Sequence, residues 1–301
     1  MRRCALALAL LLAAPAAAAP DPVVTLQHQG IARQAILHRP PGARSPRPLV
    51  LVLHGLNQPA AELQAALGLD AVADREGFAT AYPVAVIGRW NYAADRPVVL
   101  PDGGGPLDDA GFLAALVDRL VAEQVADPAA VFVTGPSRGG LLAWTLACES
   151  AGRYAGFAPL ITGMTGRQLA DCAPARPVPL LLLAGTGDRV QPYDGWLYAG
   201  YRLASVPETL EHWRRLLGCT GQASRPLPHR QAADPTRAAV VDWSGCAPGT
   251  GLRFLRVEGG GHRLPGLGET QSGPASAGLQ NQDFDTAEEI WRFFGTYLPQ
   301  R

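Results

Sequence analysis

The segment VFVTGPSRGGLLAW, residues 131–144, joins a strand-like run to a helix-forming run through a glycine-rich bend. Ser137 lies in that bend, between Gly135 and the pair Gly139 and Gly140. In a strand-to-helix turn of this kind, a serine takes a strained backbone conformation that lifts its hydroxyl above the edge of a sheet. Glycines flank it because side chains there would collide with neighbouring backbone. The segment therefore predicts a catalytic serine, with an ordinary helix cap as the alternative.

Further apolar runs on both sides of this segment are nearly continuous in hydrophobicity, as expected of strands that are covered on both faces. The strand-like runs are 48–54, 78–82, 131–135, 178–184 and 252–257. Helical patterns separate them: residues 109–124 place apolar side chains on one stripe, and Asp285 with Glu288 forms a capping pattern before an apolar helix. Strands alternating with helices predict an α/β fold, a mostly parallel sheet with helices on both faces.

Composition and charge exclude several classes of protein. The 301 residues contain 26 basic and 26 acidic side chains, and all of the basic ones are arginines. A net charge of zero offers no basic surface for a phosphate backbone, so we expect no nucleic-acid partner. The absence of lysine from the sequence excludes the P-loop lysine, the Schiff-base lysine and the Ser-x-x-Lys nucleophile. We expect no cofactor.

Residues 1–19 have the features of an export signal: two arginines, an apolar run over 5–12 and the small-residue tract 16–19. A membrane anchor is the alternative, but the apolar run is shorter than the roughly 20 residues that cross a bilayer. Cys4 precedes the apolar run and gives no support to a lipid-anchored form. We expect a single domain over residues 20–301, secreted or periplasmic, without a membrane span.

Four cysteines remain after that segment, an even number that predicts disulfides in an oxidising compartment. They are Cys148, Cys172, Cys219 and Cys246. Three pairings are possible, and proximity in the sequence favours Cys148 with Cys172 and Cys219 with Cys246. Zinc is the competing interpretation, but no Cys-x-x-Cys or spaced histidine pair accompanies them, so we expect no metal.

A serine nucleophile needs a base, and the base needs an orienting carboxylate; in this fold the chain order is Ser, Asp or Glu, then His. His262 in VEGGGHRLPG is the candidate base, because its glycine-rich setting follows a strand. His212 in a helical segment and His229 in a polar loop are interpreted as exposed surface histidines. The candidate acid is Asp188, which follows the strand at 178–184 and a Gly-Thr-Gly turn. Asp194 is the alternative candidate.

The tetrahedral intermediate of ester hydrolysis needs backbone donors aimed at its oxyanion. One candidate is the amide after the nucleophile, that of Arg138. The other is the amide of Leu56 in LVLHGLNQ, in a turn after an earlier strand. His54 is interpreted as a structural histidine that supports this loop.

With these residues identified, the chain resembles the secreted polyhydroxybutyrate-depolymerase-like and feruloyl-esterase family of α/β-hydrolases. The segments that carry the resemblance cover nearly the whole mature chain. They are LVLHGLNQ, GFATAYP, LDDAGFLAALVDRL, VFVTGPSRGG, LLLLAGTGDRVQPYDG, WSGC, VEGGGHRLPG and EEIWRFF. The resemblance implies a triad of Ser137, Asp188 and His262, and an oxyanion hole of Leu56 and Arg138.

The same resemblance implies a family disulfide between the cysteines at 219 and 246, and a structural aspartate pair, Asp108 and Asp109, that opens a helix. The sequence departs from the family at residues 84–86 after AYP and in the loop YAADRPVVLPDGGG, and we expect both to border the active-site mouth. Trp90, Tyr92 and Trp196 are candidates for lining an acyl or aromatic pocket, with ordinary packing as the alternative.

We therefore predict an exported serine esterase. The candidate substrates are short acyl esters, hydroxyalkanoate oligomers and feruloylated or acetylated polysaccharide, and soluble oligomers or small esters are favoured because no polymer-binding module is recognisable. A peptidase of the same fold shares the triad and stays an alternative. A non-catalytic binding protein on a hydrolase scaffold is the third hypothesis, which the presence of all three triad residues disfavours. The acyl group, the alcohol and the oligomeric state stay open.

Overall fold

The computed structural model describes residues 20–42, 44–93, 96–100, 104–266 and 275–300. The expected export signal, residues 1–19, lies outside the described residues. Within the described part, a ten-stranded sheet runs through the molecule in the order β1-β2-β4-β3-β5-β6-β7-β12-β11-β10. The six strands from β4 to β12 are parallel, and antiparallel pairs flank them at both edges. The predicted α/β fold with a mostly parallel sheet is confirmed.

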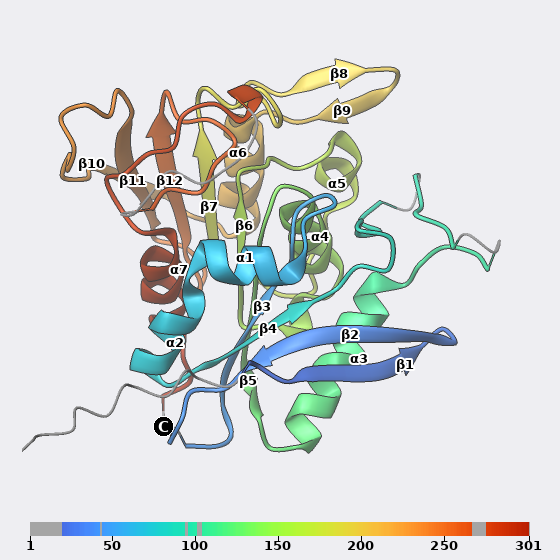
Figure 1. Ribbon diagram of the computed structural model, residues 1–301. Coiled ribbons are helices and arrows are strands. Elements are labelled where there is room, and N and C mark those ends of the chain that lie inside the picture. Colours follow the sequence, from blue (N-terminus) through green and yellow to red (C-terminus); the bar gives the residue numbers. More distant parts are fainter. Residues whose placement is uncertain (1–19, 43, 94–95, 101–103, 267–274, 301) are drawn as a thin grey trace, which may run out of the picture.

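The strands of this sheet are β1 (Val23–His28), β2 (Ile31–His38), β3 (Arg47–Val52), β4 (Ala79–Pro83), β5 (Ala126–Pro136), β6 (Gly156–Leu160), β7 (Leu180–Gly185), β10 (Gly221–Pro226), β11 (Arg237–Ser244) and β12 (Leu252–Glu258). A separate hairpin consists of β8 (Trp196–Tyr198) and β9 (Tyr201–Leu203), and it projects beyond the carboxyl ends of the parallel strands (Figure 1). The helices are α1 (Ala60–Leu67), α2 (Leu69–Glu76), α3 (Asp109–Ala122), α4 (Arg138–Glu149), α5 (Gly166–Asp171), α6 (Val206–Leu216) and α7 (Thr286–Gly295). Two short 3₁₀ turns are η1 (Ala151–Arg153) and η2 (Ala275–Ala277).

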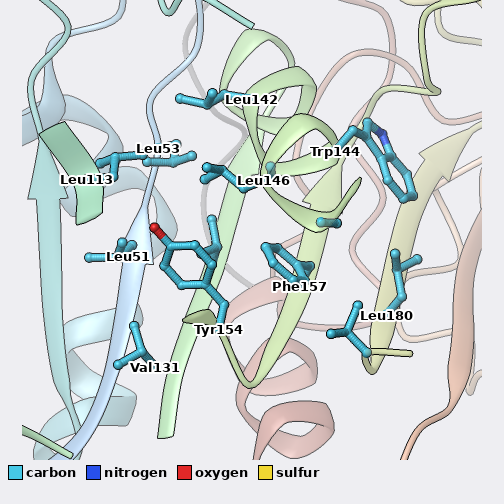
Figure 2. Close-up of a cluster of buried hydrophobic side chains, with 14 of the residues drawn as sticks. Leu51, Leu53, Leu113, Val131, Leu142, Trp144, Leu146, Tyr154, Phe157 and Leu180 are labelled. Atoms are coloured by element: carbon cyan, nitrogen blue, oxygen red, sulfur yellow. The ribbon is translucent and has the colours of Figure 1, made fainter. Parts of the chain in front are cut away.

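Helices cover both faces of the sheet because each parallel strand has apolar side chains on both of its faces. Along β3, Leu49 and Leu51 contact one core, and Val50 and Val52 contact the other. The first core includes side chains of α3, α4 and α6, and the second includes those of α1, α2 and α7. Part of the first core, with Trp144 of α4 against the strands, is drawn in Figure 2. This two-sided burial explains why the strands are nearly continuous in hydrophobicity.

The two predicted helices begin at their expected caps. The carboxylate of Asp108 accepts a hydrogen bond from the Gly111 amide (2.7 Å) at the start of α3. At the start of α7, the carboxylate of Asp285 accepts from the amide of Glu288 (3.1 Å). Each cap satisfies an amide that the helix itself leaves without a partner.

Both disulfides join cysteines that are close in the sequence, and these are the pairs that proximity favoured. Cys148 at the end of α4 is bonded to Cys172 at the end of α5. Cys219, just after α6, is bonded to Cys246, just after β11. The bond between Cys219 and Cys246 therefore links the end of α6 to the end of β11, near the edge of the sheet.

The edges of the sheet are the part of the fold that the strand-like runs did not indicate. β1, β2, β10 and β11 alternate between buried and exposed side chains or are largely exposed, so they lack the continuous apolar run of a central strand. β6 was missed for another reason, because Gly156 and Pro159 interrupt a strand of five residues that is buried throughout.

Candidate active site

Ser137 lies between the end of β5 and the start of α4, as predicted, and its backbone is strained. Its φ is 54° and its ψ is −118°, a conformation that L residues rarely adopt. The structure holds the turn from both sides: the Ser137 amide donates to the carbonyl of Leu160 on β6 (2.9 Å), and its carbonyl accepts from Leu141 in α4 (3.0 Å). Strain maintained in this way is typical of a residue positioned for a function.

The glycines around Ser137 are required by close backbone approach. A Cβ on Gly135 or on Gly139 would collide with the carbonyl oxygen of Leu53, at the end of β3. A Cβ on Gly140 would lie 2.6 Å from the Cγ2 of Thr162. The bend can therefore pack into the sheet edge only with glycine at these positions, as the sequence predicted.

His262 and Asp188 come together from the ends of two neighbouring strands, β12 and β7. The distance between Nδ1 of His262 and Oδ2 of Asp188 is 2.7 Å. The other carboxylate oxygen of Asp188 accepts hydrogen bonds from the amides of Val190 and Gln191, both at 2.8 Å. Its side chain is 1% exposed, so this carboxylate is held rigidly and away from water.

Close approach of the two strand ends makes the pairing possible. A Cβ on Gly185 would collide with the carbonyl oxygen of Gly260, and the amide of Gly187 donates to that oxygen (2.8 Å). A Cβ on Gly261 would collide with the carbonyl oxygen of Ala277. The glycine-rich segment before His262 thus lets its backbone lie directly against the Gly-Thr-Gly turn before Asp188.

The alternative acid, Asp194, and the histidines His212 and His229 form no hydrogen bond with the pair of Asp188 and His262. Asp194 is exposed and forms no hydrogen bond or ion pair with His262, which is paired with Asp188. His229 is exposed, as predicted, and its Nδ1 lies 2.9 Å from the buried Asp283 carboxylate. The prediction that His212 is exposed was wrong. It is half-buried, its Nε2 has no hydrogen-bond partner among the described residues, and burial lowers its pKa.

His54 is buried in the loop that follows β3, and both of its ring nitrogens are occupied. Nε2 accepts a hydrogen bond from the Ala85 amide (3.1 Å), so Nδ1 carries the proton and donates it to the carbonyl of Gly55 (2.7 Å). Burial lowers the pKa of His54, which favours this neutral form. The Trp90 ring centroid lies 4.9 Å from that of His54, with the two rings tilted by 42°, and Nε1 of Trp90 donates to the His54 carbonyl (2.8 Å). These contacts support the loop, in agreement with the interpretation of His54 as structural.

Leu56 and Arg138 line the same cavity, and neither backbone amide donates a hydrogen bond to any described residue. Arg138 is the first residue of α4, whose amide has no partner within a helix. Gly55, just before Leu56, has its amide occupied by Oε1 of Gln58 (2.9 Å). Two backbone donors are therefore available at the mouth of the bend.

Ser137 and His262 both line one cavity of about 850 Å³. The described contacts include no hydrogen bond between the Ser137 hydroxyl and the His262 ring. Leu56, Arg138, Tyr92 and Trp196 also line this cavity. The remaining lining residues come mainly from α1, from the loops after β7 and β12, and from the β8–β9 hairpin. Such a volume accommodates a ligand of the size of a small ester or a short oligomer.

The expectation that residues 84–86 border the mouth of the site was wrong, and Trp90 follows the alternative of ordinary packing. Trp90 does not line the cavity: it is fully buried beneath His54. Residues 84–86 do not line it either, because Ala85 is buried and its amide supports the His54 ring. Of the loop at 92–105, Tyr92 and Arg96 line the cavity, whereas residues 94–95 and 101–103 lie outside the described residues.

A second cluster in the cavity wall was not predicted as a unit. The Tyr92 and Tyr201 hydroxyls lie 3.0 Å apart. The guanidinium of Arg138 lies 4.8 Å from the Tyr92 ring centroid, and that of Arg96 lies 5.2 Å from the Tyr201 ring centroid. The four residues come from three distant segments of the sequence, so no local motif could have indicated the cluster.

Asp109, part of the predicted structural pair, anchors the loop that carries Tyr92. Its carboxylate accepts from Arg33 (2.6 Å) in a buried ion pair and from the Asn91 amide (2.6 Å). The Arg33 guanidinium also lies 3.9 Å over the ring of Phe112. The pair Asp108 and Asp109 is thus structural, one residue capping α3 and the other holding the loop.

One group of possible metal ligands occurs among the described residues: Asp21, His38 and Asp70, with ligand atoms within 4.8 Å of one another. None of them lines the cavity, and Thr80 and Tyr82 donate to the Asp70 carboxylate. The helices in the described part of the chain are all too short or too polar to span a membrane.

Comparison with known proteins places these observations among esterases. Residues 34–166 match the family model described as "Esterase PHB depolymerase". The chain is 33% identical over 275 residues to the protein named "Putative esterase NocK" of Nocardia uniformis subsp. tsuyamanensis, covering 86% of this chain and 78% of that protein.

Two further relatives are similar over most of this chain. The bifunctional acetylxylan esterase/xylanase XynS20E of Neocallimastix patriciarum is 25% identical to this chain. The match covers 89% of this chain but only 34% of that protein. Among solved structures, an acetyl xylan esterase from Aspergillus awamori superimposes with a TM-score of 0.61 over 91% of this chain and 99% of that one, at 13% identity. The structural likeness concerns the fold.

Proposed function

Because this chain belongs to the family of esterases related to polyhydroxybutyrate depolymerase, we propose that it is a serine esterase acting through Ser137, His262 and Asp188. The observation that carries this proposal is the hydrogen bond between Nδ1 of His262 and the buried Asp188 carboxylate, beside a cavity that Ser137 also lines. The strained backbone of Ser137 supports the same role, as do the amides of Leu56 and Arg138, which donate to no residue in the described part of the chain.

The Asp188–His262 contact decides which ring nitrogen acts as the base. An ionised carboxylate only accepts hydrogen bonds, so the Asp188 contact keeps the ring proton of His262 on Nδ1 and leaves the Nε2 lone pair free. Nε2 then takes the proton of the Ser137 hydroxyl as Oγ forms a bond to the carbonyl carbon of the ester. Asp188 stabilises the resulting imidazolium and does not itself take the proton.

The negative charge that develops on the carbonyl oxygen is stabilised by the amides of Leu56 and Arg138. When the tetrahedral intermediate collapses, the ester C–O bond breaks and His262 returns the proton to the departing alcohol. Water then attacks the acyl-enzyme, giving its proton to Nε2, and a second collapse releases the acid and restores the Ser137 hydroxyl. Donors already fixed in the backbone need no reorganisation during these steps.

The substrates that this proposal covers are short acyl esters, hydroxyalkanoate oligomers and feruloyl or acetyl esters of polysaccharide. The cavity of about 850 Å³ supports small esters or short oligomers. We also propose that residues 1–19 direct export and that 20–301 form one esterase domain, which the two disulfides support because such bonds persist in oxidising compartments.

The test is hydrolysis of a substrate panel by the wild-type protein and by Ser137→Ala. The panel contains 4-nitrophenyl esters of short and medium acyl chains, methyl ferulate, hydroxybutyrate oligomers and a peptide amide. We expect ester hydrolysis that the variant loses, and labelling of the wild type alone by a fluorophosphonate. Ester hydrolysis that survives in Ser137→Ala would refute the assigned nucleophile, and cleavage of the peptide amide without esters would favour the peptidase.

A further inference from the structure

Two arginines line the cavity next to Ser137, and ester hydrolysis does not explain them. They are Arg96 and Arg138, and Glu62 is the single carboxylate among the described lining residues. No carboxylate of the described residues forms an ion pair with Arg96 or Arg138. Asp109, whose charge acts on Arg138, is already held in its buried ion pair with Arg33.

Arg138 and Arg96 are held in place by uncharged groups. Nε of Arg138 donates to the carbonyl of Trp90 (3.1 Å), and its guanidinium lies over the Tyr92 ring. Nη2 of Arg96 donates to the carbonyl of Ala199, in the β8–β9 hairpin (3.2 Å), and its guanidinium lies over the Tyr201 ring. These contacts orient two cations, and no carboxylate in the described part of the chain pairs with either of them. A bound anion would stabilise such a charge.

The two tyrosines, each with one of these cations over its ring, are joined through their hydroxyls. In a pair 3.0 Å apart, one hydroxyl donates to the other, and the second keeps a proton to donate. Burial and the hydrogen bond with Tyr92 raise the pKa of Tyr201, so its hydroxyl keeps the proton. The cluster therefore offers guanidinium and phenol donors and, apart from phenol oxygens, no acceptor.

We propose that this Arg–Tyr cluster, defined as Tyr92, Arg96, Arg138 and Tyr201, binds a carboxylate carried by the ester substrate. This inference rests on the proposed esterase function and deepens it, since it makes monoesters of dicarboxylic acids and acid-terminated oligomers better substrates than their neutral analogues. Planar carboxylates suit guanidinium donors, which present their N–H groups in a fixed fork. Arg96 is a specificity-determining residue in this scheme.

The test compares substrates that differ only by a carboxylate and a neutral carboxamide. On the acyl side the pair is the 4-nitrophenyl monoester of adipate and that of adipamate. On the alcohol side it is 4-carboxyphenyl acetate and 4-carbamoylphenyl acetate. We expect the wild type to prefer the carboxylate member of at least one pair in kcat/KM, and added salt to reduce the preference because it screens the attraction.

The variant Arg96→Gln should lower the carboxylate-to-carboxamide ratio of kcat/KM by about fivefold, since a charge-assisted hydrogen bond is lost. The quantity compared is the carboxylate-to-carboxamide ratio of kcat/KM in the variant divided by the same ratio in the wild type. The different intrinsic reactivities of the esters and any general loss of activity cancel in this quotient. Arg225→Gln, which removes an exposed arginine of β10 that does not line the cavity, should leave the ratio unchanged. Tyr201→Phe should lower it in the same direction as Arg96→Gln.

Calorimetry separates this proposal from the esterase proposal. If no ester in either pair is hydrolysed, the esterase proposal fails. Binding of adipate and of adipamide to Ser137→Ala, with and without Arg96→Gln, then still tests the cluster. The proposed carboxylate site is supported if adipate binds more tightly than adipamide and Arg96→Gln removes this difference in affinity. A wild type that does not distinguish carboxylate from carboxamide, or a preference that Arg96→Gln leaves intact, overturns it.

Discussion

The substitution Gly139→Ala sets two opposing effects against each other within α4. Helix propensity favours alanine over glycine by at most about 1 kcal/mol, the value for a helix interior, and Gly139 is only the second residue of α4. The added Cβ, however, would collide with the carbonyl oxygen of Leu53 and lie 2.6 Å from its carbonyl carbon and 2.8 Å from the carbonyl oxygen of His54. Both neighbours are backbone groups at the end of β3, so no side-chain rotation relieves the overlap.

Overpacking of this kind typically destabilises by about 1–3 kcal/mol, and at a backbone collision we expect the upper half of that range. After the gain in propensity is subtracted, Gly139→Ala should lower the free energy of unfolding by about 1–3 kcal/mol. We expect relief of the collision to move the start of α4, and with it the amide of Arg138, away from β3. A displacement of about 1 Å at a catalytic group can lower activity by roughly 10²-fold.

Gly295, the last residue of α7, supplies the matched control, because a Cβ there meets no atom within 4 Å. Gly295→Ala should leave kcat unchanged and raise the free energy of unfolding by up to about 1 kcal/mol. Stability is measured by urea unfolding followed through tryptophan fluorescence, and activity with 4-nitrophenyl acetate. If Gly139→Ala is as stable as the wild type and equally active, the steric account of the bend is wrong.

Three other changes have defined outcomes. Asp188→Asn should lower kcat by roughly 10³- to 10⁴-fold with little change in circular dichroism, because an amide cannot hold the proton of His262 on Nδ1; a loss below tenfold would contradict the proposed triad. Replacing Cys219 and Cys246 by alanine should lower the free energy of unfolding by about 3.5 kcal/mol, as loop-closure entropy predicts for a separation of 27 residues, and an unchanged urea midpoint would refute this. Burial lowers the pKa of His38, but hydrogen bonds with Asp21 and Asp74 outweigh this effect, so the pKa in the folded protein is raised. At acidic pH the wild type should therefore be more stable than His38→Gln. That advantage should shrink as the pH rises through the raised pKa; an advantage that grows with pH would contradict the assignment.

Local sequence patterns were sufficient for the central part of this protein. The apolar runs at β3, β4, β5, β7 and β12 follow from burial on both faces, which needs no knowledge of the neighbouring strands. The bend at Ser137 and the cap at Asp285 are equally local, since each depends on residues within one turn of backbone. Asp188 and His262 could be selected because both directly follow predicted strands.

Only the tertiary structure decided which side chains share the cavity and which support it. Trp90 and Tyr92 are two residues apart, yet the first is buried beneath His54 and the second faces the cavity beside Arg138. Tyr201 reaches Tyr92 from the β8–β9 hairpin, across a separation of 109 residues. The periodicity of apolar residues indicates how buried a segment is. Contacts between distant loops depend instead on where the sheet places the ends of its strands. The composition of the loops does not determine those positions.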